Sequence, residues 1–197
     1  DVMAGRRERA HREAADVAGP SRDENPAHLP PASLPPDREV GEDGIVSDTR
    51  SPVAYPEPLQ DLLDTFATFD DPSERAQVLI SFADAFKPVP PEVATRPFGK
   101  DHLVPACESE AYVWARLQPD GKMNLYFAVE NPSGVSARAL ASILDRTLSG
   151  LPASVIANVS SDIVERIFRR NISMGKGMGL MAMVQAVQTL AKNASKP

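Results

Sequence analysis

Two segments just after residue 58 have the hydrophobic spacing of amphipathic helices. The first covers residues 59–71, and Asp71-Pro72 then has the residue types of a helix cap followed by proline at the first helical position. The second helix follows this cap and ends before a group of prolines, and irregular chain is expected to about Cys107. The predicted inward faces carry Leu59, Leu62, Leu63, Phe66 and Phe69 in the first helix and Leu79, Phe82 and Phe86 in the second.

Residues 110–118 and 122–130 instead alternate between two faces, which is typical of strands. In the second segment Met123, Leu125 and Phe127 share one face. Pro-Asp-Gly between the two segments predicts a tight turn. The middle of the chain is therefore predicted to form an antiparallel hairpin.

The chain after the hairpin returns to a helical spacing. An apolar stripe over residues 135–148 predicts a long helix, and a short helix follows it. Another helix is expected to run to about Arg170 with Asp162 and Glu165 capping its start, and the last helix is expected over residues 177–194. This order predicts an α+β fold in which several helices pack on a small antiparallel sheet.

Residues 1–58 have a different composition from the rest of the chain. They hold nine of the 19 prolines, one aromatic residue (Tyr55) and 7 Lys and Arg against 12 Asp and Glu. Such a segment has too little apolar surface to offset the entropy of ordering, so we expect an extended or disordered arm that binds partner chains when it is ordered. The predicted domains are this arm and a folded domain over residues 59–195. The chain begins with Asp1, so either a targeting peptide has been removed or the sequence is a cut fragment; because the arm is too acidic to be a transit peptide itself, removal of a targeting peptide is the expectation.

The whole-chain composition argues against several classes of protein. A net charge of −6 is a poor match for a nucleic-acid binder. No apolar run reaches the roughly 18 to 20 residues that span a bilayer. One cysteine cannot form an internal disulfide or a cysteine-rich zinc site, and the three histidines are too scattered to indicate a metal centre.

Cys107 is the first candidate for chemistry. It lies in a polar loop before the first strand, and Glu108 and Glu110 favour exposure of this loop. The same carboxylates disfavour negative charge on the thiol, so a reactive thiol and an inert small hydrophobic residue both remain open. His102 lies five residues upstream, but a catalytic Cys–His pair normally joins residues that are distant in sequence.

The second candidate is the glycine-rich segment over residues 173–180, where three glycines and Lys176 precede the last predicted helix. It could bind an anion through free N–H groups and the ammonium, or it could be a flexible helix-entry loop. It is neither a P-loop nor a dinucleotide fingerprint, because no Ser or Thr follows the Gly-Lys pair and no strand precedes it. The methionines around the last helix are expected to serve packing. Arg166, Arg169 and Arg170 are expected to form a solvated helix end, with a docking patch as the alternative.

Three motifs resemble those of the SufE family, whose members accept sulfur from a cysteine desulfurase during iron–sulfur cluster assembly. The segment VPACES at 104–109 resembles the family's V-x-G-C-x-S cysteine loop. Residues 149–156 resemble the T-P-x-E-I helix opening, and GLMAM at 179–183 resembles the closing G-L-x-A-M helix. The resemblance covers about residues 59–195 and implies the family's α+β fold.

The sequence departs from the family pattern at its functional loops. Ala106 replaces the family's glycine before the cysteine, and Arg138-Ala139-Leu140 replaces a K-G-L motif. Acidic residues flank Cys107 where neutral amides are typical, and residues 174–176 (MGK) replace Pro-Ser-Arg.

The resemblance implies that Cys107 is the acceptor thiol and that Lys176, Gly177 and Arg138 stabilise the persulfide anion. It implies no metal, no cofactor of the protein's own and a cysteine desulfurase as partner, which makes the protein a sulfur carrier and desulfurase activator rather than a stand-alone enzyme. The alternative is a non-catalytic SufE-like subunit that its arm tethers to a large organellar assembly, for example a photosystem supercomplex. Either reading places the protein in an organelle, a plastid rather than a mitochondrion.

Overall fold

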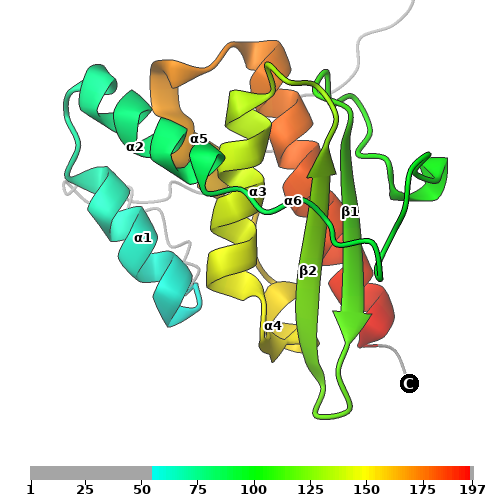
Figure 1. Cartoon of the computed structure of the whole chain (residues 1–197). Coiled ribbons are helices and arrows are strands. Elements are labelled where there is room, and N and C mark those ends of the chain that lie inside the picture. The colour runs from blue at the N-terminus through cyan, green and yellow to red at the C-terminus, as the bar shows by residue number, and fades with distance from the viewer. Residues whose placement is uncertain (1–54, 196–197) are drawn as a thin grey trace, which may run out of the picture. The chain divides into compact units, whose positions relative to one another are not determined.

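The computed structural model describes residues 55–195, and the arm predicted over residues 1–58 lies outside this range except for its last four residues. The order of elements confirms an α+β fold (Figure 1). Two 3-10 turns, η1 (Lys100–His102) and η2 (Arg169–Asn171), accompany the helices and strands. In chain order, the helices and strands are α1 (Glu57–Ala67), α2 (Pro72–Asp84), β1 (Ala111–Leu117), β2 (Lys122–Val129), α3 (Val135–Leu148), β3 (Leu151–Pro152), α4 (Ala153–Ile156), α5 (Ile163–Phe168) and α6 (Met174–Ala194).

The sheet consists of the predicted hairpin and one short additional strand. β1 and β2 pair antiparallel, and β3 adds two residues to the other edge of β2. The turn between β1 and β2 needs Gly121, whose φ of 79° lies in the left-handed region that favours glycine. α3 packs on β2 and α6 packs on β1, so both long helices cover the same face of the sheet (Figure 1). Val113 and Phe127 point from this face into the core.

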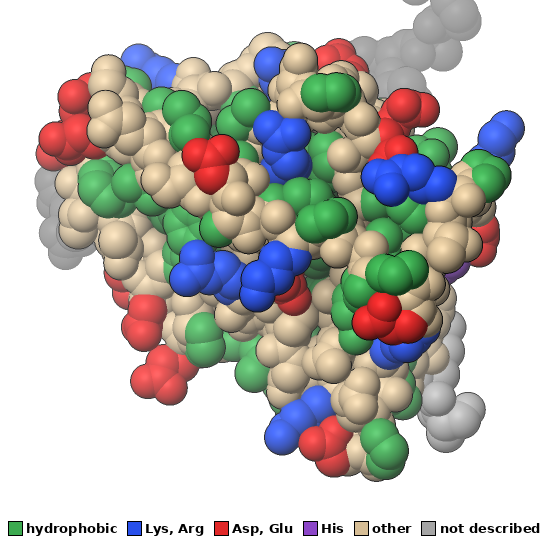
Figure 2. Space-filling view, viewed as in Figure 1, with side chains coloured by type: hydrophobic (Ala, Val, Ile, Leu, Met, Phe, Trp, Pro, Cys, Tyr) green, Lys and Arg blue, Asp and Glu red, His purple; other side chains and the backbone are tan. Residues whose placement is uncertain are grey.

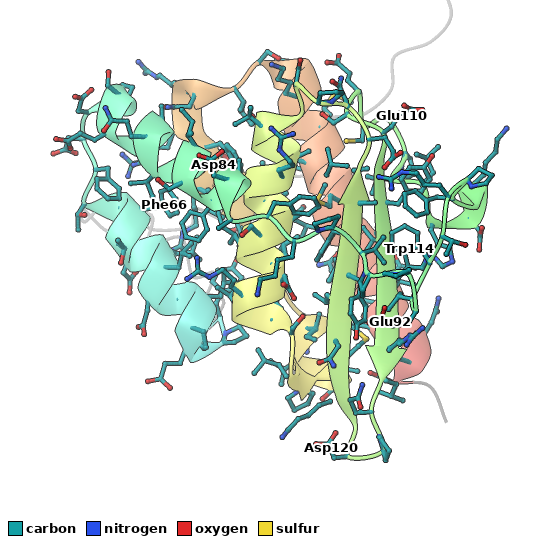
Figure 3. All side chains as sticks on the ribbon, in the orientation of Figure 1. Phe66, Asp84, Glu92, Glu110, Trp114 and Asp120 are labelled. Carbon is teal, nitrogen blue, oxygen red and sulfur yellow. The ribbon has the colours of Figure 1, made fainter. Side chains whose placement is uncertain are left out.

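The other face of β1 is covered by irregular chain that precedes the cysteine loop. The ring centroid of Phe98 lies 5.1 Å from that of Trp114, and the His102 ring lies 5.2 Å from the same indole. An ion pair of 2.8 Å between Arg96 and Glu130 ties this segment to the end of β2. Trp114 is consequently only 7% exposed although it points away from the helices (Figure 3).

A buried arginine joins three of the helices. Arg75 on α2 is 2% exposed, and its guanidinium donates hydrogen bonds to the carbonyls of Phe66, Phe69 and Ile167 at 2.6, 2.7 and 3.0 Å. These carbonyls lie at or just beyond the C-terminal ends of α1 and α5, where the helices leave acceptors without intrahelical partners. Burial, together with the charge of Arg169, lowers the pKa of Arg75, and the carbonyl dipoles compensate for its desolvation.

Several predicted helix ends are confirmed, whereas α1 ends at Ala67, four residues before the predicted end, and three further details differ. Asp71 caps α2 by accepting from the Ser73 N–H at 2.8 Å, as predicted. Asp162 does not cap α5, because its carboxylate instead accepts a 2.5 Å hydrogen bond from the Tyr55 hydroxyl. α6 begins at Met174, three residues before the predicted start. The last residues assigned to the arm also belong to the folded domain, since Tyr55 is buried in the core and α1 begins at residue 57.

Charged side chains of both signs alternate over the face that Figure 2 presents, between apolar patches of limited extent. Among the helices of residues 55–195, none is both long and apolar enough to cross a membrane. The same range contains no cluster of three or more His, Cys, Asp or Glu residues that could hold a metal ion.

Candidate functional site

Cys107 lies in a closed loop at one end of the sheet. The Val104 N–H donates to the Ala111 carbonyl at 2.8 Å, so the residues between them form a loop with adjoining ends. Within it the Glu110 N–H donates to the Cys107 carbonyl at 3.1 Å. Figure 3 shows Glu110 at the end of the sheet opposite Asp120, which lies in the hairpin turn. The loop therefore sits where β1 begins, and it holds a half-buried free thiol.

Two residues of this loop have unusual backbone angles. Ala106 and Glu110 adopt φ values of 54° and 46°, in the left-handed region that glycine occupies without steric cost. The family pattern has glycine at the position of Ala106, and the structure explains that preference directly. The alanine retains the turn that glycine would make, at the cost of local backbone strain.

Gly179 on α6 lets the helix contact the cysteine loop at its backbone. A Cβ atom at Gly179 would lie 3.0 Å from the Ala106 carbonyl oxygen and 3.1 Å from the Cys107 Cα. On the other side, a Cβ at Gly134 would lie 3.1 Å from the Cβ of Ser109. Both glycines therefore permit close approach to the loop, and any larger residue at either position must displace a neighbour.

A small pocket opens beside Cys107, between the loop, the start of α3 and the first turns of α6. Its volume of about 30 Å³ exceeds the roughly 10 to 15 Å³ that a cavity needs to hold one water molecule. Its walls are mostly small or polar side chains, together with the charged Glu108 and Lys176. The lining residues are Cys107, Glu108, Ser109, Ser133, Gly134, Val135, Ser136, Ala137, Gly175, Lys176, Gly179 and Leu180.

The structure brings some of the predicted site residues together and separates others. Lys176 and Cys107 line the same pocket, and the lysine side chain is exposed. Gly177 does not line the pocket: it is buried, and its N–H donates to the Ser173 carbonyl at 2.9 Å. Arg138 also lies outside the lining, because its guanidinium donates to the Pro132 carbonyl at 2.8 Å.

The glycine-rich segment is helix rather than a flexible entry loop. Ser173 caps α6, with its hydroxyl accepting from the Lys176 N–H at 3.4 Å. Met174 and Met178 are 86% and 61% exposed, so the expectation that the methionines pack is wrong for these two, although it holds for the buried Met183. An exposed apolar surface therefore adjoins the pocket on the first two turns of α6.

His102 belongs to the aromatic cluster on β1. Its Nδ1 lies 3.1 Å from the Val113 carbonyl oxygen, and its Nε2 lies 3.2 Å from Asp101. Both ring nitrogens therefore have partners other than the Cys107 thiol, which agrees with the low weight that the sequence gives to a Cys–His pair.

Two serines of the pocket, Ser133 and Ser136, were not identified from the sequence. Ser133 and Ser136 reach the site because the end of β2 runs beside the cysteine loop: the Asn131 N–H donates to the Ser109 carbonyl at 3.2 Å. The turn signal Asn-Pro-Ser-Gly at 131–134 was available, but only the strand register shows that this turn faces Cys107.

The fold and site together describe a small α+β protein with a supported cysteine loop and an adjoining polar pocket. A solved structure with this fold is the solution structure of a hypothetical protein from Thermus thermophilus, with a TM-score of 0.57 and 25% sequence identity. The match covers 72% of this chain and 98% of the Thermus chain. A search of curated proteins gave no match.

The sequence model of the SufE family, described as an Fe-S metabolism associated domain, matches residues 60–191. The chain therefore belongs to the SufE family, as its cysteine loop and closing helix indicated. Membership in this family suggests a role in Fe–S metabolism.

Proposed function

We propose that Cys107 accepts sulfur from a cysteine desulfurase and carries it as a persulfide for iron–sulfur cluster assembly. The observation that carries this proposal is the position of the thiol. Cys107 is half-exposed on a loop that Gly179 and Gly134 contact closely, and it opens on a polar pocket that Lys176 also lines. A sulfur carrier needs an accessible thiol of fixed position, and this loop supplies both.

The transfer is a thiol exchange that needs no external oxidant or reductant. The Cys107 thiolate attacks the outer sulfur of a persulfide on the desulfurase, and a new sulfur–sulfur bond forms at Cys107. The sulfur–sulfur bond of the donor breaks, and the donor cysteine leaves as a thiolate that can take up the proton released from Cys107. The pocket of about 30 Å³ has room for the added sulfur, and the ammonium of Lys176 favours its negative charge.

Intact-mass measurement tests this proposal directly. After incubation with a desulfurase and free cysteine, the protein is expected to gain the mass of one sulfur atom, and a reductant is expected to remove it. Cys107→Ser leaves the chain without cysteine and should gain nothing, whereas Gly177→Ala, outside the pocket, should behave as wild type. An unmodified wild-type protein after incubation with desulfurases that modify another SufE protein would contradict the acceptor role.

A second function is favoured by the acidic residue next to the thiol. Glu108 lines the pocket and opposes a persulfide anion there, which supports a non-catalytic accessory subunit. In that case Cys107→Ser would retain the protein's association with its assembly, and the wild-type protein would gain no sulfur. Co-purification of the two forms, combined with the mass assay, distinguishes the two functions.

A further inference from the structure

Glu108 is a charged residue of the pocket that the transfer reaction does not use. Its Oε1 lies 3.7 Å from the position that a Cβ at Gly175 would occupy, so the carboxylate reaches the first turn of α6. A Cβ at Gly175 would make only an ordinary van der Waals contact with this carboxylate. Glu108 therefore places a negative charge at the mouth of the pocket, one residue from Cys107.

The positive charges on this side do not neutralise Glu108 by direct contact. Lys176 lines the same pocket, but the two side chains form no ion pair within 4.0 Å among the described residues. The N-terminal end of α6 offers only a partial positive charge. A group that approaches Cys107 through the pocket thus meets a carboxylate that is partly compensated and still accessible.

We propose that Glu108 is a specificity-determining residue that slows the reaction of Cys107 with anionic partners. The inference rests on the proposed sulfur transfer and deepens it. Small anionic thiols and disulfides are repelled, whereas a protein donor that presents a Lys or Arg side chain to Glu108 can deliver its persulfide sulfur. The carboxylate thereby favours a protein partner of matching positive charge over small anionic molecules in solution.

Coulomb's law gives the size of the expected effect. A carboxylate and an approaching anion about 6 Å apart, at an effective dielectric constant between those of the protein surface and water, interact strongly enough to change a rate about 3- to 10-fold. Salt screens charges at the surface, so the effect is expected to shrink as ionic strength rises.

The test compares two disulfide reagents of different charge on the full-length protein. With either reagent the thiolate attacks one sulfur, the reagent's sulfur–sulfur bond breaks and a chromophoric thiol leaves. The rate with an anionic reagent, 5,5′-dithiobis(2-nitrobenzoate), is divided by the rate with the neutral 4,4′-dithiodipyridine. This ratio cancels any change in the fraction of Cys107 present as thiolate, because that fraction affects both rates equally.

The matched control lies two residues away on the same loop. Glu110 is also exposed, but it does not line the pocket. Glu108→Gln is expected to raise the anionic-to-neutral ratio about 3- to 10-fold at low salt, and Glu110→Gln is expected to change it less than twofold. An unchanged ratio in Glu108→Gln would overturn the inference, as would an equal rise in both variants, which would reflect net charge alone.

A desulfurase experiment separates this inference from the proposed function. Glu108→Lys is expected to accept sulfur from the desulfurase more slowly than wild type while reacting faster with the anionic reagent. The disulfide ratio needs no desulfurase, so a failure of sulfur transfer in the wild-type protein would reject the proposed function and leave the charge selectivity of Cys107 measurable. Faster sulfur acceptance by Glu108→Lys would overturn the idea of a positively charged partner.

Discussion

Two glycines on α6 should respond in opposite ways to the same substitution. Gly177→Ala places a methyl group 3.6 Å from the Cδ1 of Ile172, which is an ordinary contact distance. Alanine also has a higher helix propensity than glycine by about 1 kcal/mol, so this variant should be more stable than wild type by about 0.5 to 1 kcal/mol. Gly179→Ala gains the same propensity but places its methyl group 3.0 Å from the Ala106 carbonyl oxygen and 3.1 Å from the Cys107 Cα.

The two neighbours of Gly179 are backbone atoms, so they cannot move aside as a flexible side chain would. Overpacking of this kind typically costs about 1 to 3 kcal/mol, which exceeds the propensity gain. Gly179→Ala should therefore destabilise the protein by about 1 kcal/mol. Its free energy of unfolding should be about 2 kcal/mol lower than that of Gly177→Ala. The displaced loop should also expose Cys107 further and raise its rate of alkylation.

Urea unfolding followed by tryptophan fluorescence measures both variants. Trp114 is the only tryptophan, and on β1 it is buried beneath Phe98 and His102, so its emission reports loss of the folded domain. Equal stabilisation by both alanines would refute the close contact between α6 and the cysteine loop. Destabilisation by both would refute the assignment of Gly177 to a site with room for a methyl group.

Three further changes have expected outcomes. Ala106→Gly should raise the free energy of unfolding by up to about 1 kcal/mol, because glycine adopts the φ of 54° without strain; no gain in urea unfolding would contradict this backbone assignment. Arg75→Met should lower the free energy of unfolding by about 3 kcal/mol or more, because several buried carbonyls lose their donor, and a loss below about 1 kcal/mol would show that water replaces the guanidinium. Burial and the hydrogen bond to Asp162 raise the pKa of Tyr55 to about 12, so this tyrosine's contribution to stability should be complete below pH 10 and be lost as the pH rises from about 10 to 12. Tyr55→Phe should show a smaller loss of stability over that interval, and parallel pH profiles of the two proteins would argue against the contact.

Local sequence signals were sufficient for the hairpin and for the start of α2. A period of two with Pro-Asp-Gly between the segments fixed both strands within about one residue, because turn and alternation are properties of neighbouring residues. Asp71 followed by proline fixed the start of α2 for the same reason. Cys107 and Lys176 were also identified as candidates from residue type alone, since a polar loop and a glycine-rich segment surround them.

Tertiary contacts decided what the sequence could not. β3 is two residues long and is defined by its pairing with Lys122 and Met123 of β2, which no periodicity reveals. Tyr55 pairs with Asp162 across 107 positions, so a residue assigned to the arm became part of the core. The early start of α6 has the same origin: its glycines lower helix propensity, yet packing against the cysteine loop keeps the segment helical.

Two residues at the cysteine loop have backbone conformations that cost free energy, and their position supports an active role for this loop. Gly179 inside a helix gives up about 1 kcal/mol relative to alanine, and Ala106 in the left-handed region gives up about 1 to 2 kcal/mol relative to an ordinary backbone conformation. Ala106 directly precedes Cys107 in the sequence, and Gly179 is in direct contact with the cysteine loop. If the loop served only to connect η1 and β1, it could lie further from α6, and alanine could then replace Gly179 without a clash. Unfavourable backbone conformations usually persist where the surrounding structure holds a functional group in place, so these costs support the proposal that Cys107 is the functional residue of this loop.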